Sequence, residues 1–599
     1  MIAAGKAALR NAPVVLAILP AVAFLTVFLL VPVAQMLGLS LFAADGSPTL
    51  SNFARLFEST VYMRVLWNSV LTATMTALFC VVIAYPVAYL LSTARPGTRA
   101  ALLIWVLLPL WTSFLVRAVA WILILGDQGV LNSGLKAIGL IDEPFRMINT
   151  FFGVLVGTVH AMVPIAVMMM LSVMATIDRD LGHASATLGA RGAQSFWRVF
   201  FPLSLPGVVA AALIVFVNAL GFFVASQLLG GVRDMMISQL IIQQIEEVFD
   251  LSFAGALGAV LLFTTLLIIA LFDRVLGLTS LTGDHSRLEK NRARGKSALG
   301  RVGTGLTDLA GDVCAAIGEA ADRLFRRRPR GADKARRPIL ALTVGCVIVF
   351  IAAPAFILIP ASFSETPFLS WPPRGFTLEW YQGFFTSPAW SAALFRSIVV
   401  GFLTAMCAMA IGVPAAYVLG RRSFPGKPLL LTFILIPVVL PSIIIGVGLF
   451  YLYSRIGLLQ TTAGLVLGHT VFALPYVVIT AMAALRTYDD RLDQAASTLG
   501  ASRLTTFRLI SFPLMRMGMA SAFLFAFVQS FDELSVALFV ASPTMPTLPR
   551  QLWAEALYRL SPTLAAASTV MILIVALPIV ASQLSGRLRT ARERRRNDR

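Results

Sequence analysis

The chain has 599 residues, of which 58% are hydrophobic and only 13% are charged, and its mean hydropathy is +0.84. Ordinary soluble domains have about 25% charged residues and about 45–50% apolar residues, so the composition excludes a soluble globular protein. The net charge of +19 comes largely from basic stretches beside apolar runs. Such flanks are typical of membrane proteins, and they do not indicate a nucleic-acid partner.

Apolar runs of roughly 20 residues recur along the chain, the length that a helix needs to cross about 30 Å of hydrocarbon. The runs lack the two-residue alternation of outer-membrane strands, which favours helices over a barrel. The first run is longer than the roughly 7–15 apolar residues of a signal peptide, which favours an uncleaved span. We predict twelve spans, at about 13–37, 65–93, 101–126, 151–175, 206–230, 253–278, 338–362, 393–420, 428–453, 463–486, 516–541 and 562–583.

Three basic stretches agree with one orientation of these spans. The amino terminus is basic, residues 284–337 hold 14 Lys and Arg against 7 Asp and Glu, and the last residues are rich in Arg. Basic loops stay in the cytoplasm, so an even number of spans places both termini and the linker there. The predicted organisation is a first half at 1–282, a basic linker at 283–337, a second half at 338–583 and a basic tail at 584–599.

A polar segment after the fourth span returns after the tenth. Gly189 and Gly500 are separated by an offset of 311, as are Pro202 and Pro513, so no residue is gained or lost inside the segment. Four residues further upstream repeat at an offset of 328. Ser69, Pro86, Tyr89 and Pro109 of the first half match Ser397, Pro414, Tyr417 and Pro437 of the second half. The halves are therefore parallel repeats. Because the offset falls between these four residues and the polar segment, the second half is shorter there, and we assign the additional residues to the outer loop Gly126–Thr150 of the first half.

The repeated segment predicts a helical elbow on the cytoplasmic face. Asp178 in one copy and Asp489 in the other can cap a short helix by accepting a free backbone N–H. The glycine of each copy favours a break that lets a second short helix leave at an angle. We expect the proline of each Phe-Pro pair to end that second helix before the chain re-enters the membrane.

These segments, 178–207 and 489–518, resemble the EAA loop, E-A-A-x-x-x-G-x9-I-x-L-P, of the permeases of bacterial ATP-binding-cassette importers. The family's Glu is replaced by His or Gln, so docking through packing and hydrogen bonds is expected. The alternative is an ordinary amphipathic loop that was duplicated with its half. The resemblance implies that an ATPase docks on His183, Ala184, Ser185, Gly189, Pro202, Gln494, Ala495, Ala496, Gly500 and Pro513.

Further segments are similar to the two permeases of spermidine/putrescine importers. Residues 108–117 and 221–231 resemble one of them, and residues 531–536 and 547–549 resemble the other. This resemblance implies an all-α, type I importer permease fold, with two parallel six-helix halves fused in one chain of the bacterial inner membrane. It also implies two copies of a cytoplasmic ATPase, an external solute-binding protein and membrane lipid as partners. Importers of aminoethylphosphonate, ferric iron or thiamine share much of the pattern, so these solutes are alternatives to a polyamine.

The sequence does not predict an enzyme. It has no GxxxxGK[ST] phosphate loop, no nucleophile with a matching base and no metal-ligand spacing, so no cofactor is expected and ATP would be bound by the partner subunits. His160 and His469 lie in spans and do not match under the repeat, which favours interior hydrogen-bonded side chains over ligands. An ion-coupled secondary carrier, which can also have two parallel halves, is the alternative from another class.

Three of the charged residues inside predicted spans stand out, because an ionised group within a span costs at least about 2.5–3.5 kcal/mol and should face a protein interior or water. They are Asp532, Glu533 and Arg117. One interpretation is a solute path along these three residues, with an acidic wall formed by the two carboxylates and cation–π contacts from Trp111 and Trp121. In the other, Arg117 pairs with one carboxylate and holds the halves together, while the tryptophans anchor the chain at the membrane interface.

Overall fold

The computed structural model describes residues 2–42, 46–190, 192–276, 316, 332–369, 371–486, 488, 489 and 491–577. Their regular structure is helical, apart from an isolated β-bridge between Phe42 and Pro48. Within this part of the chain, 10 helices are long and apolar enough to cross a membrane, or 11 if a bent pair is one span. The basic tail and nearly all of the linker lie outside the described residues.

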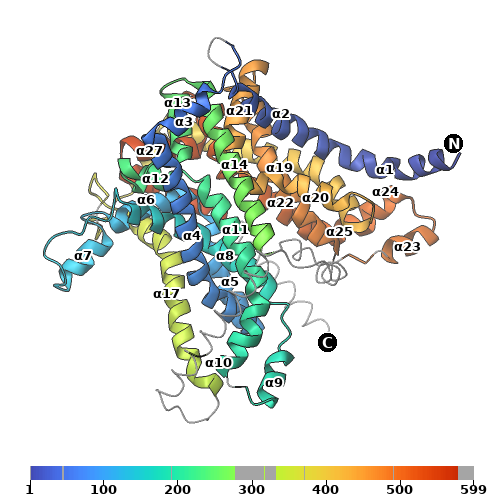
Figure 1. Cartoon of the computed structure of the whole chain (residues 1–599), viewed down its shortest axis with the longest axis horizontal. Coiled ribbons are helices and arrows are strands. Elements are labelled where there is room, and N and C mark those ends of the chain that lie inside the picture. The colour runs from blue at the N-terminus through green and yellow to red at the C-terminus, as the bar shows by residue number, and fades with distance from the viewer. Residues whose placement is uncertain are drawn as a thin grey trace. The chain divides into compact units, whose positions relative to one another are not determined.

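The chain folds into two compact units. One unit comprises residues 60–239 and 260–360, and its centre consists of α4, α8 and α11, which pack on one another (Figure 1). Its helices are α4 (Thr60–Thr93), α5 (Pro96–Leu107), α6 (Phe114–Leu125), α7 (Val130–Ala137), α8 (Phe151–Met174), α9 (Asp180–Thr187), α10 (Gly192–Ser195), α11 (Phe201–Leu220), α12 (Val224–Leu229) and most of α17 (Ala332–Ala361). Shorter turns are η2 (Leu108–Trp111), η3 (Phe196–Phe200) and η4 (Val232–Asp234).

The other unit comprises residues 1–59, 240–259 and 361–599, and α19, α22 and α25 form its centre. Small residues let these helices approach closely, among them Ala405, Ala473 and Ala526, all fully buried. Its elements are α1 (Ile2–Leu25), η1 (Thr26–Leu30), α2 (Val31–Leu39), α3 (Ser51–Glu58), α18 (Glu379–Thr386), α19 (Pro388–Arg421), α20 (Lys427–Val439), α21 (Ser442–Ile456), α22 (Thr462–Arg486), α23 (Arg491–Thr498), α24 (Arg503–Thr506), η6 (Phe507–Ser511), α25 (Phe512–Phe531), α26 (Ser535–Val540) and α27 (Leu548–Tyr558).

The units do not follow the order of the sequence. The first span, α1 with α2, packs against α19 and α21 of the second half, and Gly448 lies against Pro32 where a Cβ would be 3.1 Å from the proline carbonyl carbon. Conversely, α17 belongs to the unit that holds most of the first half. Two further helices, α13 (Ile237–Glu246) and α14 (Leu251–Leu276), are divided between the units.

The backbone repeats as the sequence predicts. At the offset of 311, the helices α8, α9, α11 and α12 have their counterparts in α22, α23, α25 and α26, and at the offset of 328, α4 has its counterpart in α19. The hydrogen bonds repeat as well. The Ser69 hydroxyl accepts from the Ile237 N–H at 2.8 Å, and the equivalent Ser397 hydroxyl accepts from the Leu548 N–H at 2.7 Å. The repeat is thus one of tertiary contacts and not only of residue types.

The additional residues of the first half lie where they were assigned. Between Leu125 and Thr150 the chain forms α7 and its flanking turns, whereas the equivalent connection of the second half runs from the end of α21 directly through a short turn to Thr461. Thr150 and Thr461 then play the same part, since each hydroxyl accepts a backbone N–H at the start of the next helix.

Several predicted spans are broken helices, and the count of twelve is not confirmed. The span predicted at 101–126 consists of α5 with η2, then α6, and its counterpart at 428–453 consists of α20 and α21, which meet at 94°. The spans predicted at 206–230 and 516–541 are also interrupted, after Leu220 and after Phe531. The breaks after Leu220 and Val439 fall in apolar sequence, so composition alone did not reveal them, whereas the break after Phe531 carries the acidic pair Asp532 and Glu533.

Candidate functional site

A buried polar cluster occupies the break between α25 and α26. The side chain of Glu533 folds toward the start of α26, where Val536 N–H donates to its two oxygens at 2.9 and 3.0 Å and Ala537 N–H donates at 3.3 Å. Glu533 is 6% exposed. A helix that starts inside the protein has unpaired N–H groups, and a carboxylate satisfies them. The acidic pair therefore lies at a helix break and not within a continuous span, which corrects the prediction.

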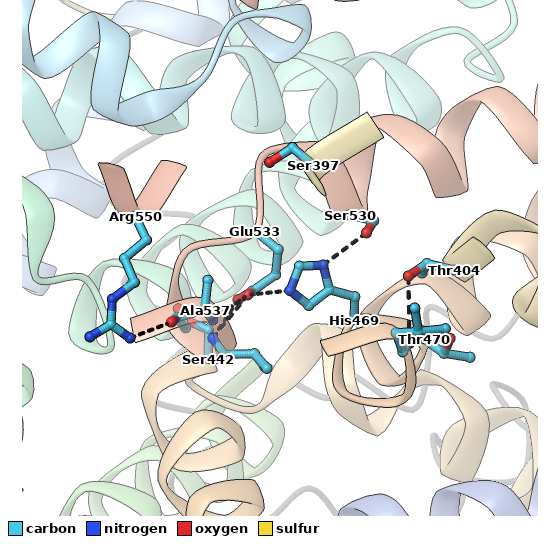
Figure 2. Close-up of polar contacts among 12 residues, drawn as sticks. Ser397, Thr404, Ser442, His469, Thr470, Ser530, Glu533, Ala537 and Arg550 are labelled. Atoms are coloured by element: carbon cyan, nitrogen blue, oxygen red, sulfur yellow. Dashed lines mark hydrogen bonds and ion pairs between the residues drawn. The ribbon is translucent and has the colours of Figure 1, made fainter. Parts of the chain in front are cut away.

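His469 of α22 completes this cluster, as Figure 2 shows. Its Nε2 lies 3.5 Å from Oε2 of Glu533, and its Nδ1 is hydrogen-bonded to the Ser530 hydroxyl at 2.8 Å. The imidazole is 1% exposed, so the prediction of an interior hydrogen-bonded side chain is confirmed. His160, in the other unit, is equally buried and donates from Nε2 to the Ile351 carbonyl at 3.0 Å.

Arg550 of α27 holds the opposite end of α26. Its guanidinium donates to the Ala537 carbonyl at 2.9 Å and also to the carbonyls of Leu538 and Ala541 (Figure 2). The Glu533 carboxylate at the amino end of α26 and the Arg550 guanidinium at its carboxyl end both interact favourably with the helix dipole. Each such interaction stabilises a helix by on the order of 1 kcal/mol. Two charged side chains thus fix a helix of six residues that is too short to be stable alone.

The equivalent helix of the first half, α12, is held by different chemistry. Phe222 occupies the position of Glu533, and its ring packs on Phe114 with 4.2 Å between the ring centroids. Gln239 occupies the position of Arg550 and donates to the Gln227 side chain at 2.7 Å. The backbone contact at the end of the helix is shared, because Asn149 N–H donates to Leu229 as Gln460 N–H donates to Val540.

The remaining residues of the predicted path lie in the unit built around α4, α8 and α11. Arg117 is 8% exposed, donates from Nε to the Ser113 carbonyl at 3.4 Å and lies over the Phe114 ring. Trp121 is 5% exposed and packs against the rings of His160 and Phe350. Trp111 ends η2, and its side chain lies outside the described residues. A pairing of Arg117 with Asp532 or Glu533 stays a prediction.

The two repeated polar segments form matching elbows. The helices α9 and α23 are followed by Gly189 with φ +86° and Gly500 with φ +80°, a left-handed conformation that glycine adopts without strain. The predicted caps are confirmed, since Asp178 accepts the Asp180 N–H at 3.0 Å and Asp489 accepts the Arg491 N–H at 2.9 Å.

The expected role of the prolines is wrong. Pro202 and Pro513 do not end a helix but stand at the second residue of α11 and α25, directly after the π-helical turns η3 and η6. The backbone before each proline is already helical, so the proline does not stand at a free helix start; its missing N–H falls where the π-helical turn interrupts the α-helical hydrogen bonds. The chain therefore runs without a stop from the elbow into the span.

One exposed face is the same in both elbows. Leu188 is 88% exposed and its counterpart Leu499 is 87% exposed, while Leu181 and Leu492 are 43% and 41% exposed. In each elbow the two leucines are seven residues apart, which places them on the same helix face. Two further exposed residues of each elbow lie on this face at spacings of three or four residues, and they too match between the elbows. These matched pairs are Ala184 with Ala495 and Thr187 with Thr498. Other exposed positions differ, for example Asp180 against Arg491, which reverses the charge.

The first elbow rests on an aromatic support. Tyr89 of α4 packs edge-on against Phe196 and Phe200, with 5.3 and 5.0 Å between centroids. The Tyr85 ring contacts Phe196 and Phe201, and its hydroxyl is hydrogen-bonded to Ser204 of α11 at 2.9 Å.

The second elbow rests on a polar support around Asp493. Its carboxylate accepts from Arg421 Nη1 at 3.1 Å, from the Ser511 hydroxyl at 2.9 Å and from the Tyr488 hydroxyl. Partial burial would raise the pKa of Asp493, but the hydrogen bonds from Tyr488, Arg421 and Ser511 outweigh it and hold the pKa below its usual value. Sequence reasoning missed Asp493. Its only signal was a carboxylate one residue before Gln494, where the EAA motif has its Glu.

The helical spans, the internal repeat and the paired elbows define a membrane permease of a binding-protein-dependent importer. Residues 70–279 and 412–594, more than half of the chain, match the family described as "Binding-protein-dependent transport system inner membrane component". The chain belongs to this family, contains its domain twice and is a multi-pass, non-catalytic membrane component of a transport system.

The relatives are single permeases that each match less than half of the chain. The spermidine/putrescine transport system permease protein PotB of Haemophilus influenzae is 34% identical over 36% of this chain and 78% of its own length. The corresponding PotC of Escherichia coli is 30% identical over 41% of this chain and 92% of its own length. A chain of a bacterial ABC transporter involved in alginate import is 19% identical, with a TM-score of 0.40, over 45% of this chain and 98% of that chain.

Proposed function

We propose that this chain supplies both permease halves of an ATP-driven importer that carries a polyamine such as spermidine or putrescine across the bacterial inner membrane. The observation that supports the proposal most is the family domain present twice, together with relatives that are named spermidine/putrescine permeases. A fused pair replaces the two separate permeases. In this proposal both termini are cytoplasmic, and a solute-binding protein delivers the polyamine on the outer side.

We further propose that the two elbows dock two copies of one ATPase, which binds and hydrolyses ATP on a separate chain. The matched leucines support this, because aliphatic side chains that are 88% and 87% exposed on a polar loop lose water-accessible apolar surface when a partner covers them. Since the two faces carry identical residues, a single ATPase surface fits both. His183, Ser185 and Gln494 differ from their counterparts and would tune the contact rather than create it, whereas Ala496 is 5% exposed and lies beneath the face.

Substitution of the exposed leucines tests the docking. Leu188→Glu or Leu499→Glu should abolish copurification of the ATPase and the uptake that depends on it, while membrane levels stay normal. Val232→Glu, which changes an equally exposed aliphatic residue outside the elbows, is the matched control. Loss of two different ATPases from the two variants would contradict a shared partner. Retention of the ATPase by both variants would contradict docking at the elbows.

For the solute path, we propose that Asp532 attracts the cationic solute. It is partly exposed beside the break, whereas its neighbour Glu533 is buried. Arg117, Trp111 and Trp121 were predicted to share this path. Asp532→Asn should raise the KM for spermidine about tenfold, the size of one lost charge-assisted hydrogen bond, with little change in kcat.

Uptake by the intact transporter separates the solutes and the mechanisms. Labelled spermidine should enter in a vanadate-sensitive, ATP-dependent manner when the binding protein is present, and unlabelled putrescine should compete. Competition by aminoethylphosphonate, thiamine or ferric iron instead would replace the polyamine by that solute. Uptake that continues without ATP and collapses with the ion gradient would contradict the importer and favour an ion-coupled carrier.

A further inference from the structure

Asp493 differs in its contacts from the other charged groups described on the two elbows. It lies on α23 but points toward the bundle, and its side chain is 27% exposed. Three groups donate to it, and each comes from a different place in the fold. Arg421 is the last residue of α19, Tyr488 follows α22, and Ser511 ends the turn that leads into α25. One carboxylate thus contacts every element to which the second elbow is attached.

Arg421 is itself fixed in place. Its Nη1 also donates to the Tyr417 hydroxyl at 2.9 Å, and its guanidinium carbon lies 4.7 Å from the ring centroids of both Tyr417 and Tyr488. The arginine is only 13% exposed. An isolated exposed ion pair contributes little because water screens it and the side chains lose freedom. Here the Arg421 guanidinium is held by the two tyrosine rings as well as by Asp493, and three donors share the one carboxylate. The network therefore stabilises the elbow more than an isolated ion pair would.

The first elbow is joined to its bundle by a different charged contact, because Arg179 donates from Nη2 to the Ser92 carbonyl of α4 at 2.8 Å. The positions that match the network around Asp493 do not reproduce it. Gly182, Thr93, Ile177 and Phe200 occupy the positions of Asp493, Arg421, Tyr488 and Ser511, and none of them is charged. The backbone of the elbow is nevertheless the same. The network is therefore not needed to form an elbow as such, and what it adds is a rigid connection between α23 and the spans.

We infer that Asp493 is a positioning residue that couples the second elbow to the membrane helices. The EAA motif has its Glu one position later, at Gln494, and the carboxylate of Asp493 makes contacts inside the protein. It does not contact the docking face, whose leucines point away from the bundle. Its part is to keep α23 from swinging independently when a partner pushes on it. The inference deepens the proposed docking of an ATPase, on which its functional consequence rests.

Local mobility tests the inference without any ATPase. The four cysteines, Cys80, Cys314, Cys346 and Cys407, are replaced by serine, and a nitroxide is attached at Thr498→Cys on α23 or at the equivalent Thr187→Cys on α9. Asp493→Asn should increase the mobility of the label at 498 and leave the label at 187 unchanged. Arg491→Gln, which removes an exposed charge two residues away, is the matched control and should change neither label. An unchanged label at 498 in Asp493→Asn would overturn the inference.

Charge exchange and coupling distinguish positioning from general stabilisation. The pair Arg421→Asp with Asp493→Arg should restore the immobile label, whereas either substitution alone should not; failure of the pair to restore it would overturn the ionic part of the inference. In the complex with the copurifying ATPase, Asp493→Asn should lower the stimulation of ATP hydrolysis by spermidine-loaded binding protein about tenfold, the size of one charge-assisted hydrogen bond, with the KM for spermidine unchanged. If no ATPase copurifies with the unaltered chain, the proposed function fails while the mobility result still stands.

Discussion

The short helices α12 and α26 lie at equivalent positions of the two repeats, yet Phe222 precedes one and Glu533 precedes the other. The phenylalanine packs on Phe114, while the glutamate accepts hydrogen bonds from the helix it precedes. The elbows show the same contrast, with edge-on aromatic contacts at the first elbow and a network around Asp493 at the second. In both places the second half uses a carboxylate where the first half has aromatic packing, although Arg179 also joins the first elbow to α4 through the Ser92 carbonyl.

The contrast separates what each position must do. Residues that only hold a backbone in place can be exchanged for any chemistry that holds it, so they differ between the halves. Residues that fix an unusual backbone angle, such as Gly189 and Gly500, or that form the matched exposed face, such as Leu188 and Leu499, are the same in both. The following predictions test this separation.

The largest effect is expected at the two turn glycines. Gly500 has φ +80°, and its N–H donates to the Ser497 carbonyl. Proline lacks the N–H and cannot adopt a positive φ, so Gly500→Pro should abolish uptake while membrane insertion stays normal. Gly189→Pro should have the same effect for the same reasons. Asparagine tolerates this conformation, so Gly500→Asn is the control that should keep most of the uptake. Normal uptake by Gly500→Pro would remove the elbow from the mechanism.

A second prediction contrasts the supports of α26 and α12. Glu533→Ala leaves buried N–H groups without an acceptor and should lower the free energy of unfolding by about 1–3 kcal/mol. Glu533→Gln should recover most of this loss, because the amide oxygen still accepts. At the equivalent position, Phe222 makes an apolar contact. Phe222→Leu should therefore be tolerated better than Phe222→Gln.

Thermal unfolding of the solubilised chain measures all four variants of these two positions. If Glu533→Gln is no more stable than Glu533→Ala, and Phe222→Gln is as stable as Phe222→Leu, the two supports are not chemically different.

A smaller effect is expected from the aromatic support of the first elbow. Tyr85→Phe removes the hydrogen bond to Ser204 but keeps the ring contacts with Phe196 and Phe201, so it should cost about 0.5–1.5 kcal/mol in the free energy of unfolding. Tyr85→Ala removes the ring as well and should cost clearly more. If both variants unfold at the same temperature, ring packing is not what holds this elbow.

The smallest effect concerns pH. Because the pKa of Asp493 is held below its usual value, the network contributes stability above the unfolded pKa of about 3.9, and this is lost as the pH falls through the folded pKa. A nitroxide at Thr498→Cys should therefore keep the same mobility from pH 8 to pH 5 and become mobile only in stronger acid. The label at Thr187→Cys should show no such step, because Gly182 stands on α9 where Asp493 stands on α23. A step near neutral pH at position 498 would contradict the assignment to Asp493.

The sequence by itself determined the features that depend on residues near one another or on constant spacing. Apolar runs of about 20 residues predicted the membrane helices, since crossing hydrocarbon requires that length. Two fixed offsets, 311 and 328, revealed the repeat, and the step between them located the additional residues of the first half. The elbows with their aspartate caps and turn glycines were also readable, because capping and positive φ are properties of a few consecutive residues.

Only the tertiary structure decided where the spans break and which polar side chains hold the broken ends. The N–H groups of α26 need an acceptor because they are buried among apolar helices, but their partners are supplied by Glu533 and, through it, by His469, which lies on a different helix. The contact of Arg421 with Asp493 likewise spans 72 positions. Such pairs leave no periodic or compositional trace, because they depend on which helices become neighbours when the chain packs.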